Sequence, residues 1–195
     1  MNYILPMLIY MFVMAITPGP NNLTMLYLGG SNGLGGSFRF LAASTFGFFA
    51  KNVICAFLNV ALADIVPQIV SYLKWVGAAY MLYLAWNMAK SGWQKSEVSG
   101  KEGGNTLKNG IILQVLNAKS WIAALTVYAT YAIPYTNSGI LMVAFAGMFT
   151  VLMIASSLLW GLCGEILRKF ITRYRKAFGL IMAASLVYCA VSAVV

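Results

Sequence analysis

Six apolar segments run along the chain, and short polar stretches separate them. Each segment is long enough, at a rise of about 1.5 Å per helical residue, to cross a hydrocarbon core about 30 Å thick. The segments cover approximately residues 3–28, 40–63, 72–89, 108–133, 139–164 and 177–194. This pattern predicts an all-α integral membrane protein with six transmembrane helices in a single domain over residues 1–195. The polar stretch 64–71, which contains Pro67, predicts an interfacial turn.

The composition agrees with this class of protein. Hydrophobic residues make up 61% of the chain, charged residues only 9%, and the mean hydropathy is +0.81. These values lie far outside the range of soluble domains, so the lipid bilayer is the expected environment. The net charge of +9 does not indicate nucleic-acid binding, because the basic residues lie between the apolar segments and do not form one amphipathic face.

The basic residues also predict the orientation of the chain in the membrane. They gather in the first, third and fifth connections, at Arg39, Lys90, Lys95, Lys101, Lys108, Arg168, Lys169, Arg173, Arg175 and Lys176. Lys and Arg near membrane spans are retained on the cytoplasmic side. We therefore expect these connections inside and both termini outside. The apolar run 4–16 has no basic region before it and no persuasive cleavage site after it, so we expect it to remain as the first span.

The first segment is interrupted by the run Thr17-Pro18-Gly19-Pro20-Asn21-Asn22. Proline has no N–H to donate and glycine relaxes the helix, so carbonyls near residues 14–16 are expected to lose their partners. Such a break survives in a bilayer only where protein groups or a water-filled cavity satisfy the freed groups. The run therefore predicts a break that faces the protein interior.

A break at Pro20 would start a short helix near Asn21, with free N–H groups and a positive dipole end at the membrane centre. That end can bind a carboxylate, and Thr17, Asn21 and Asn22 can hydrogen-bond a zwitterion. The alternative is a proline kink that only lets the first span fit its neighbours. Thr17, Pro18, Gly19, Pro20, Asn21 and Asn22 are the candidate substrate-binding residues of this segment.

The fourth segment has a polar interruption at a similar depth, Asn117-Ala118-Lys119-Ser120. Three spans per half would give two halves of opposite topology, so we predict a 3+3 inverted repeat in which the first helix of each half is broken. Asn117 and Lys119 join the candidate substrate site. Lys119 could pair with a substrate carboxylate, cap freed carbonyls, or extend toward the inner face of the membrane.

A second intramembrane lysine, Lys51, shares a helical face with Ser44, Cys55 and Asn59. This face is expected to be interior. Lys51 would line the transport pathway or, in the alternative that we favour, make a structural hydrogen bond to another span. Gly47 and Tyr80 are further candidates for the pathway, although the spacing Ala43-x-x-x-Gly47 is also typical of close helix contact.

The residues that most enzymes need are missing from the predicted membrane interior. The chain has no histidine, and its four acids, Asp64, Glu97, Glu102 and Glu165, lie near span ends or in connections. This argues against Ser-His chemistry, paired catalytic carboxylates and zinc motifs, so we expect no catalytic residues, no metal and no cofactor. Cys55, Cys163 and Cys189 are odd in number and lie in apolar segments, which argues against a disulfide framework.

Taken together, these motifs resemble the LysE/RhtB amino-acid exporters, which are small six-span proteins of the bacterial inner membrane. The resemblance covers essentially the whole chain. It rests on Thr17-Pro18-Gly19-Pro20-Asn21, on Gly33, Gly36 and Arg39, on Leu73 to Tyr80, and on Gln114-Val115-Leu116-Asn117-Ala118-Lys119. Leu84-Ala85-Trp86 and Leu186 to Val191 look most like the cysteine/O-acetylserine exporters within that family. Many members have proline where this chain has Ala118.

The resemblance implies export of a small neutral amino acid or derivative from the cytoplasm, driven by protons and working by alternating access. No carboxylate lies near the membrane centre to carry the proton, which leaves Asp64 and Glu165 as the acids available. The alternative from another class is a non-coupled membrane channel or a redox-associated scaffold. The sequence also leaves open a homo-oligomer.

Overall fold

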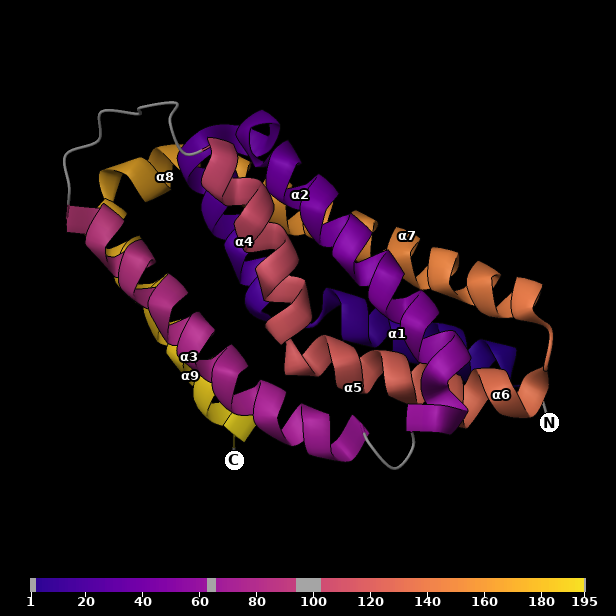
Figure 1. Ribbon diagram of the computed structural model, residues 1–195. Helices are drawn as coiled ribbons and strands as arrows, with labels where there is room; N and C mark the ends of the chain where they lie inside the picture. The colour runs from indigo at the N-terminus through magenta and orange to yellow at the C-terminus, as the bar shows by residue number, and fades with distance from the viewer. Residues whose placement is uncertain (1–2, 63–65, 94–102, 195) are drawn as a thin grey trace.

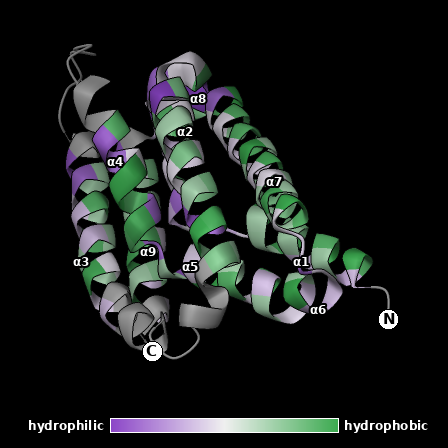
Figure 2. Ribbon diagram, turned by 45° about the vertical axis from the view of Figure 1, so that its right-hand side comes forward, coloured by the Kyte–Doolittle hydropathy of each residue, from purple (hydrophilic) through white to green (hydrophobic). Residues whose placement is uncertain are grey.

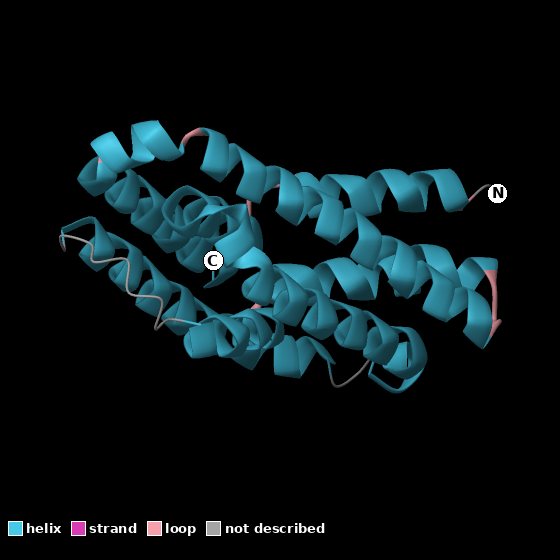
Figure 3. Cartoon of the chain, turned by 90° about the horizontal axis from the view of Figure 1, so that it is seen from above, coloured by secondary structure: helices cyan, strands magenta, loops and turns pink. Residues whose placement is uncertain are grey.

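The computed structural model describes residues 3–62, 66–93 and 103–194, and this part of the chain consists of helices joined by short loops (Figures 1 and 3). In chain order the elements are α1 (Ile4–Ile16), α2 (Pro20–Leu62), α3 (Val66–Trp93), α4 (Gly103–Leu116), α5 (Ala118–Thr126), the π-helix η2 (Val127–Ala132), α6 (Ile133–Tyr135), α7 (Gly139–Ile166), α8 (Arg168–Arg173) and α9 (Arg175–Val194).

The longest element, α2, contains two arms that meet at Gly33. Its 43 residues would extend about 65 Å as one straight helix, roughly twice the hydrocarbon thickness of a bilayer. Gly33 has φ 78° and ψ 166°, a backbone conformation that favours glycine, and the chain turns there. We call residues 20–32 the first arm and residues 34–62 the second arm.

Several helices meet the length and composition that a membrane span requires. Pro20–Phe57 and Gly139–Ile166 do so individually, and Leu107–Leu116 with Ala118–Tyr135 do so as a pair bent by 58°. Ile4–Ile16 and Lys176–Ser192 are shorter apolar helices. In the described part of the chain, two or three spans thus stand out by these criteria, which is a coarser result than the six predicted.

The helices pack in pairs around two apolar clusters. α2 lies along α7 and α4, and α3 lies along α9. One cluster joins α1, the second arm of α2, α5, η2 and α7, with Met11, Phe149 and Tyr128 at its centre. The other joins the first arm of α2 to α3, α4 and α9, around Met25 and Leu186. The breaks in the first and fourth predicted spans lie between these two clusters.

The two ends of the molecule differ in polarity. The start of α1 and the end of α9 lie at the same end, away from α8 (Figures 1 and 2). Hydrophilic positions gather around α8, which carries Arg168, Lys169 and Arg173 (Figure 2).

One prediction for a connection is wrong. The stretch 64–71 was expected to be an interfacial turn, but α3 already begins at Val66. Pro67 lies in the first turn of this helix, where its missing N–H has no intrahelical partner to lose.

Candidate functional site

The first predicted span is broken where the proline run was expected to break it. α1 ends at Ile16, Thr17 is extended with φ −60° and ψ 137°, and α2 begins at Pro20. The freed carbonyls at the end of α1 are taken up by side chains. Ala15 O accepts from Asn22 Nδ2 at 2.8 Å and from Ser156 Oγ at 2.8 Å, and Ile16 O accepts from Trp160 Nε1 at 3.2 Å. Protein side chains therefore satisfy these freed carbonyls, while Pro18 itself is exposed.

The fourth predicted span is also broken, although it has no proline at the joint. Asn117 leaves the helical conformation, with φ −79° and ψ 91°, and its side chain accepts a hydrogen bond from Ser120 N as the N-cap of α5. Asparagine is among the preferred N-cap residues, so the cap replaces the proline as the cause of the break. The freed carbonyl of Val115 accepts from Trp121 Nε1 at 2.8 Å.

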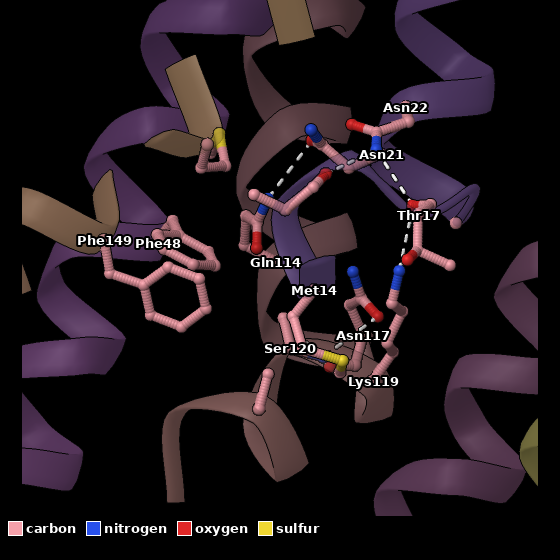
Figure 4. A pocket seen from close by; sticks show the side chains of 14 residues that line it. Met14, Thr17, Asn21, Asn22, Phe48, Gln114, Asn117, Lys119, Ser120 and Phe149 are labelled. Carbon is pink, nitrogen blue, oxygen red and sulfur yellow. Dashed lines mark hydrogen bonds between the residues drawn. The ribbon is translucent and has the colours of Figure 1, made fainter. Parts of the chain in front are cut away.

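A small cavity lies where the two breaks meet (Figure 4). Its volume of about 40 Å³ would fit a few water molecules. The starts of α2 and α5 both border it, so two positive helix ends lie beside one space. The lining residues are Met14, Ala15, Thr17, Gly19, Asn21, Asn22, Phe48, Gln114, Asn117, Lys119, Ser120, Ala123, Phe149 and Met153.

Asn21 is the centre of the polar wall. Its Nδ2 donates to Ser157 Oγ of α7 at 2.9 Å, and its Oδ1 accepts from Gln114 Nε2 of α4 at 3.1 Å. All three residues are buried. Both hydrogen bonds fix the orientation of the Asn21 amide, because Oδ1 meets a donor and Nδ2 meets an acceptor. The backbone N–H groups at the start of α2 are thereby held beside the cavity.

Lys119 crosses from the second break to the first. Its Nζ donates to Thr17 O at 2.9 Å and to Pro18 O at 3.5 Å (Figure 4). The sequence predicted three alternative roles for Lys119, and the structure shows one of them, the capping of freed carbonyls. The same amine also lines the cavity, which leaves it available to a bound carboxylate.

Lys51, on the second arm of α2, lies behind the cavity wall and is only 3% exposed. Its Nζ donates to Gln114 O at 3.4 Å, to Gln114 Oε1 at 3.2 Å and to Ser120 Oγ. The structural hydrogen bond to another span, our favoured reading of this lysine, is therefore present. Lys51 binds the end of α4 and the start of α5, and it is not among the residues that line the cavity.

The opposite wall of the cavity is apolar. Phe48 and Phe149 meet edge to face with ring centroids 5.0 Å apart (Figure 4). Met14 and Met153 also line the cavity. An amphipathic ligand would find polar groups on one side and polarisable apolar groups on the other.

The charge around the cavity is positive. None of its lining residues is acidic, whereas Lys119 lines it and Lys51 lies behind it. Glu165 is exposed, and its Oε2 accepts from Leu34 N at 3.0 Å at the start of the second arm of α2. Asp64, the other acid considered for proton coupling, lies outside the described residues. Lys119 and the starts of two helices favour an anionic group in this space.

The structure brings together most of the substrate-binding residues predicted from the sequence. Six of them line the cavity: Thr17, Gly19, Asn21, Asn22, Asn117 and Lys119. Pro18 and Pro20 shape the break without lining it. Gly47 and Tyr80 also lie outside the lining: Gly47 packs closely against Gln114, and the Tyr80 ring stacks on Tyr83.

Sequence reasoning gave no role in the site to several residues that the fold places there. Gln114 and Ser120 belong to the sequence motifs of the fourth predicted span, but neither was predicted to bind substrate. Ser157 carried a weak signal, because Ser156 and Ser157 form a polar pair within an otherwise apolar segment. The apolar wall of Met14, Phe48, Phe149 and Met153 had no signal, since such residues are common throughout this chain.

Comparisons with known proteins match one family over most of the chain. Residues 12–195 match the family model described as LysE type translocator. A cysteine/O-acetylserine efflux protein of Klebsiella pneumoniae subsp. pneumoniae is 34% identical over 188 residues, which cover 96% of this chain and 95% of that relative. The proteins of the same description from Salmonella typhi and Escherichia coli K12 are 33% and 31% identical over 182 residues, covering 93% of this chain and 92% of each relative. No solved structure matches the chain. These matches confirm the resemblance found in the sequence.

Proposed function

This chain belongs to the LysE type translocator family, and from that membership we propose that it exports a small neutral amino acid or derivative of the cysteine/O-acetylserine kind. Export would run from the cytoplasm across the bacterial inner membrane, coupled to protons. The relatives at 31–34% identity, which are described as cysteine/O-acetylserine efflux proteins, support this substrate class.

The observation that carries the proposal is the meeting of two broken helices at one cavity. The starts of α2 and α5 direct their positive ends into it, and no acidic residue lines it. A zwitterionic amino acid has a carboxylate that suits these helix ends. It also has an ammonium that can donate to the Thr17 carbonyl and the Asn117 side chain.

In the proposed complex, the carboxylate contacts the N–H groups near Asn21 and Asn22, with Lys119 as its cationic partner. Thr17 and Asn117 complete the polar site. The substrate side chain then faces Phe48 and Phe149, where a thiol or an acetyl group can pack against aromatic and thioether surface.

Six spans in two inverted halves would give this site its access to both sides of the membrane. The first half would be α1 with the first arm of α2, then the second arm, then α3. The second would be α4 to α6, then α7, then α9. A cavity of about 40 Å³ is small for an amino acid, so movement of one half against the other is needed to open it. The basic α8 would face the cytoplasm and both termini the outside.

Counterflow in proteoliposomes tests this function. Vesicles are preloaded in turn with cysteine, O-acetylserine, threonine, homoserine or lysine, and uptake of the labelled amino acid is followed. We expect exchange with cysteine or O-acetylserine. We expect Asn21→Leu to lower it at least about tenfold, because the amide that orders the helix start is lost.

Asn87→Leu is the matched control, since Asn87 is exposed on α3 and far from the cavity lining. It should exchange as the native protein does. Absence of exchange with every amino acid, in vesicles that contain folded protein, would contradict the proposed function. A channel would instead dissipate the gradient without accumulating label.

A further inference from the structure

Lys51 is a buried amine without an acidic partner among the described residues. Its hydrogen-bond acceptors, Gln114 and Ser120, are neutral, and Glu165 is the only carboxylate side chain in the part of the chain that the structure describes. Its Nζ lies 5.0 Å from the ring centroid of Phe48 and 5.7 Å from that of Trp121. A charge inside a membrane is costly, so an amine without a charged partner there calls for a functional explanation.

On one side, Lys51 reaches the substrate cavity through a hydroxyl. Ser120 lines the cavity, accepts from Lys51 Nζ, and donates to Asn117 O at 2.8 Å. A serine hydroxyl can accept one proton while it donates another. Lys51 is therefore one hydroxyl away from the space assigned to the substrate.

On the other side, buried polar groups continue from Lys51 toward the end of the second arm of α2. Cys55 follows one helical turn later and is buried in the same cluster as Tyr128 of η2. Asn52 shares the buried face of this arm. The second arm runs from Gly33, beside α8, to the end that holds both termini, so this side faces outward in the proposed orientation.

Two atoms in this outer region have no hydrogen-bond partner among the described residues. They are Asn52 Oδ1 and Tyr128 OH, on side chains that are 0% exposed. A buried polar atom without a partner destabilises the fold and is normally explained by a bound water or a functional role. Tyr128 also lies in a π-helix, which often marks a functional site.

We propose that Lys51 is the proton carrier of this transporter, receiving protons from the outside along Asn52, Cys55 and Tyr128 and releasing them to the cavity through Ser120. This inference rests on the proposed function. It supplies a coupling group beside the cavity, whereas Glu165 is exposed and does not line it.

The chemistry needs only water as a co-reactant. A hydronium ion that enters from outside protonates the neutral amine, giving an ammonium and water. The ammonium later gives its proton to water in the cavity and returns to the neutral amine. One N–H bond forms and one breaks in each cycle, so one proton moves inward. The titratable groups that face this path are Cys55 on α2, Tyr128 on η2 and, across the cavity, Lys119 on α5.

The test separates exchange from coupling in proteoliposomes. Exchange is measured by counterflow of labelled cysteine under reducing conditions. Coupling is measured as accumulation driven by an imposed pH gradient, and as substrate-dependent acidification reported by entrapped pyranine. The variants are Lys51→Met, Lys51→Arg and Tyr128→Phe, with Lys108→Met as the matched control because Lys108 is exposed on α4.

We expect both Lys51 variants to keep exchange within about threefold of native and to lose proton movement at least about tenfold. Lys51→Arg matters most, because a guanidinium keeps the charge and can hydrogen-bond but does not release its proton. Tyr128→Phe removes one hydroxyl with little change in volume, so it should slow proton movement without altering exchange. The control should match the native protein in both assays.

Native-like proton movement in Lys51→Arg would overturn the proposal. Loss of exchange and coupling together in folded Lys51→Arg would also overturn it, because Lys51 would then be structural. If Lys51→Met does not fold, Lys51→Arg and Tyr128→Phe still test whether Lys51 carries the proton. Failure of the native protein to exchange any amino acid is a different result, which contradicts the proposed function itself.

Discussion

At the scale of single residues, Asn21 shows how one side chain joins three separate parts of the chain. It starts the first arm of α2, donates to Ser157 of α7 and accepts from Gln114 of α4. A buried amide costs free energy when it loses a partner, so its neighbours are as important as Asn21 itself. The site therefore depends on residues that would not contact the substrate.

Ser157→Ala tests this dependence. It removes the hydroxyl that accepts from Asn21 Nδ2 and leaves that donor buried, which we expect to destabilise the protein by about 1–3 kcal/mol. Thermal unfolding in detergent should occur at a lower temperature, and the substrate concentration for half-maximal counterflow should rise. The matched control is Ser185→Ala, because Ser185 donates to the Ile181 carbonyl of its own helix. If the two variants have the same unfolding temperature and the same substrate concentration for half-maximal counterflow, Ser157 has no structural role at Asn21.

At the scale of elements, the crossing of the first arm of α2 with α7 depends on glycine. A Cβ added at Gly164 would fall on the Leu26 carbonyl and 2.8 Å from the Gly30 nitrogen. A Cβ added at Gly29 would likewise fall on the Gly161 carbonyl. The two backbones are therefore in direct contact, which small residues permit in membrane helices. This contact fixes the helix that begins at the substrate site.

Gly164→Ala should force these two helices apart. We expect a loss of about 1–3 kcal/mol from overpacking, partly offset by the better helix propensity of alanine. Gly147→Ala is the control in the same helix, because nothing lies within 4 Å of a Cβ added at Gly147. It should be neutral or slightly stabilising. The measurement is thermal unfolding of both variants in detergent, and an unchanged midpoint for Gly164→Ala would show that the crossing can relax.

At the scale of the whole molecule, the two termini and the basic residues of α8 lie at opposite ends (Figure 2). Both termini lie at the end away from α8, and basic residues gather around α8 (Figure 2). The polar cavity lies between two apolar clusters, one toward each end. This arrangement suits a site within the apolar part of the molecule.

Reporter fusions test the orientation. Alkaline phosphatase fused at the C-terminus should be active and green fluorescent protein at the same position dark, because we expect this end outside. Fusions within the basic fifth connection should give the reverse pattern, since Lys and Arg are retained inside. The opposite result at both positions would show that the chain has the opposite orientation in the membrane, and the proposed direction of export would then be wrong.

The sequence by itself determined the class, the first break and most of the polar site. Proline lacks a backbone N–H in any environment, so Pro18 and Pro20 predict a helix break whatever residues surround them. Asn117 and Lys119 were found because polar residues are costly in an apolar span. Local chemistry was enough for these residues.

Only the tertiary structure decided how the groups combine. It placed Lys51 behind the cavity and Lys119 on the carbonyls of the first break, and it brought Ser157 to Asn21 across 136 positions of the chain. It also showed that an asparagine cap breaks the fourth span without proline. Such contacts depend on which helix faces meet, and packing between distant segments determines those faces, whereas local sequence does not.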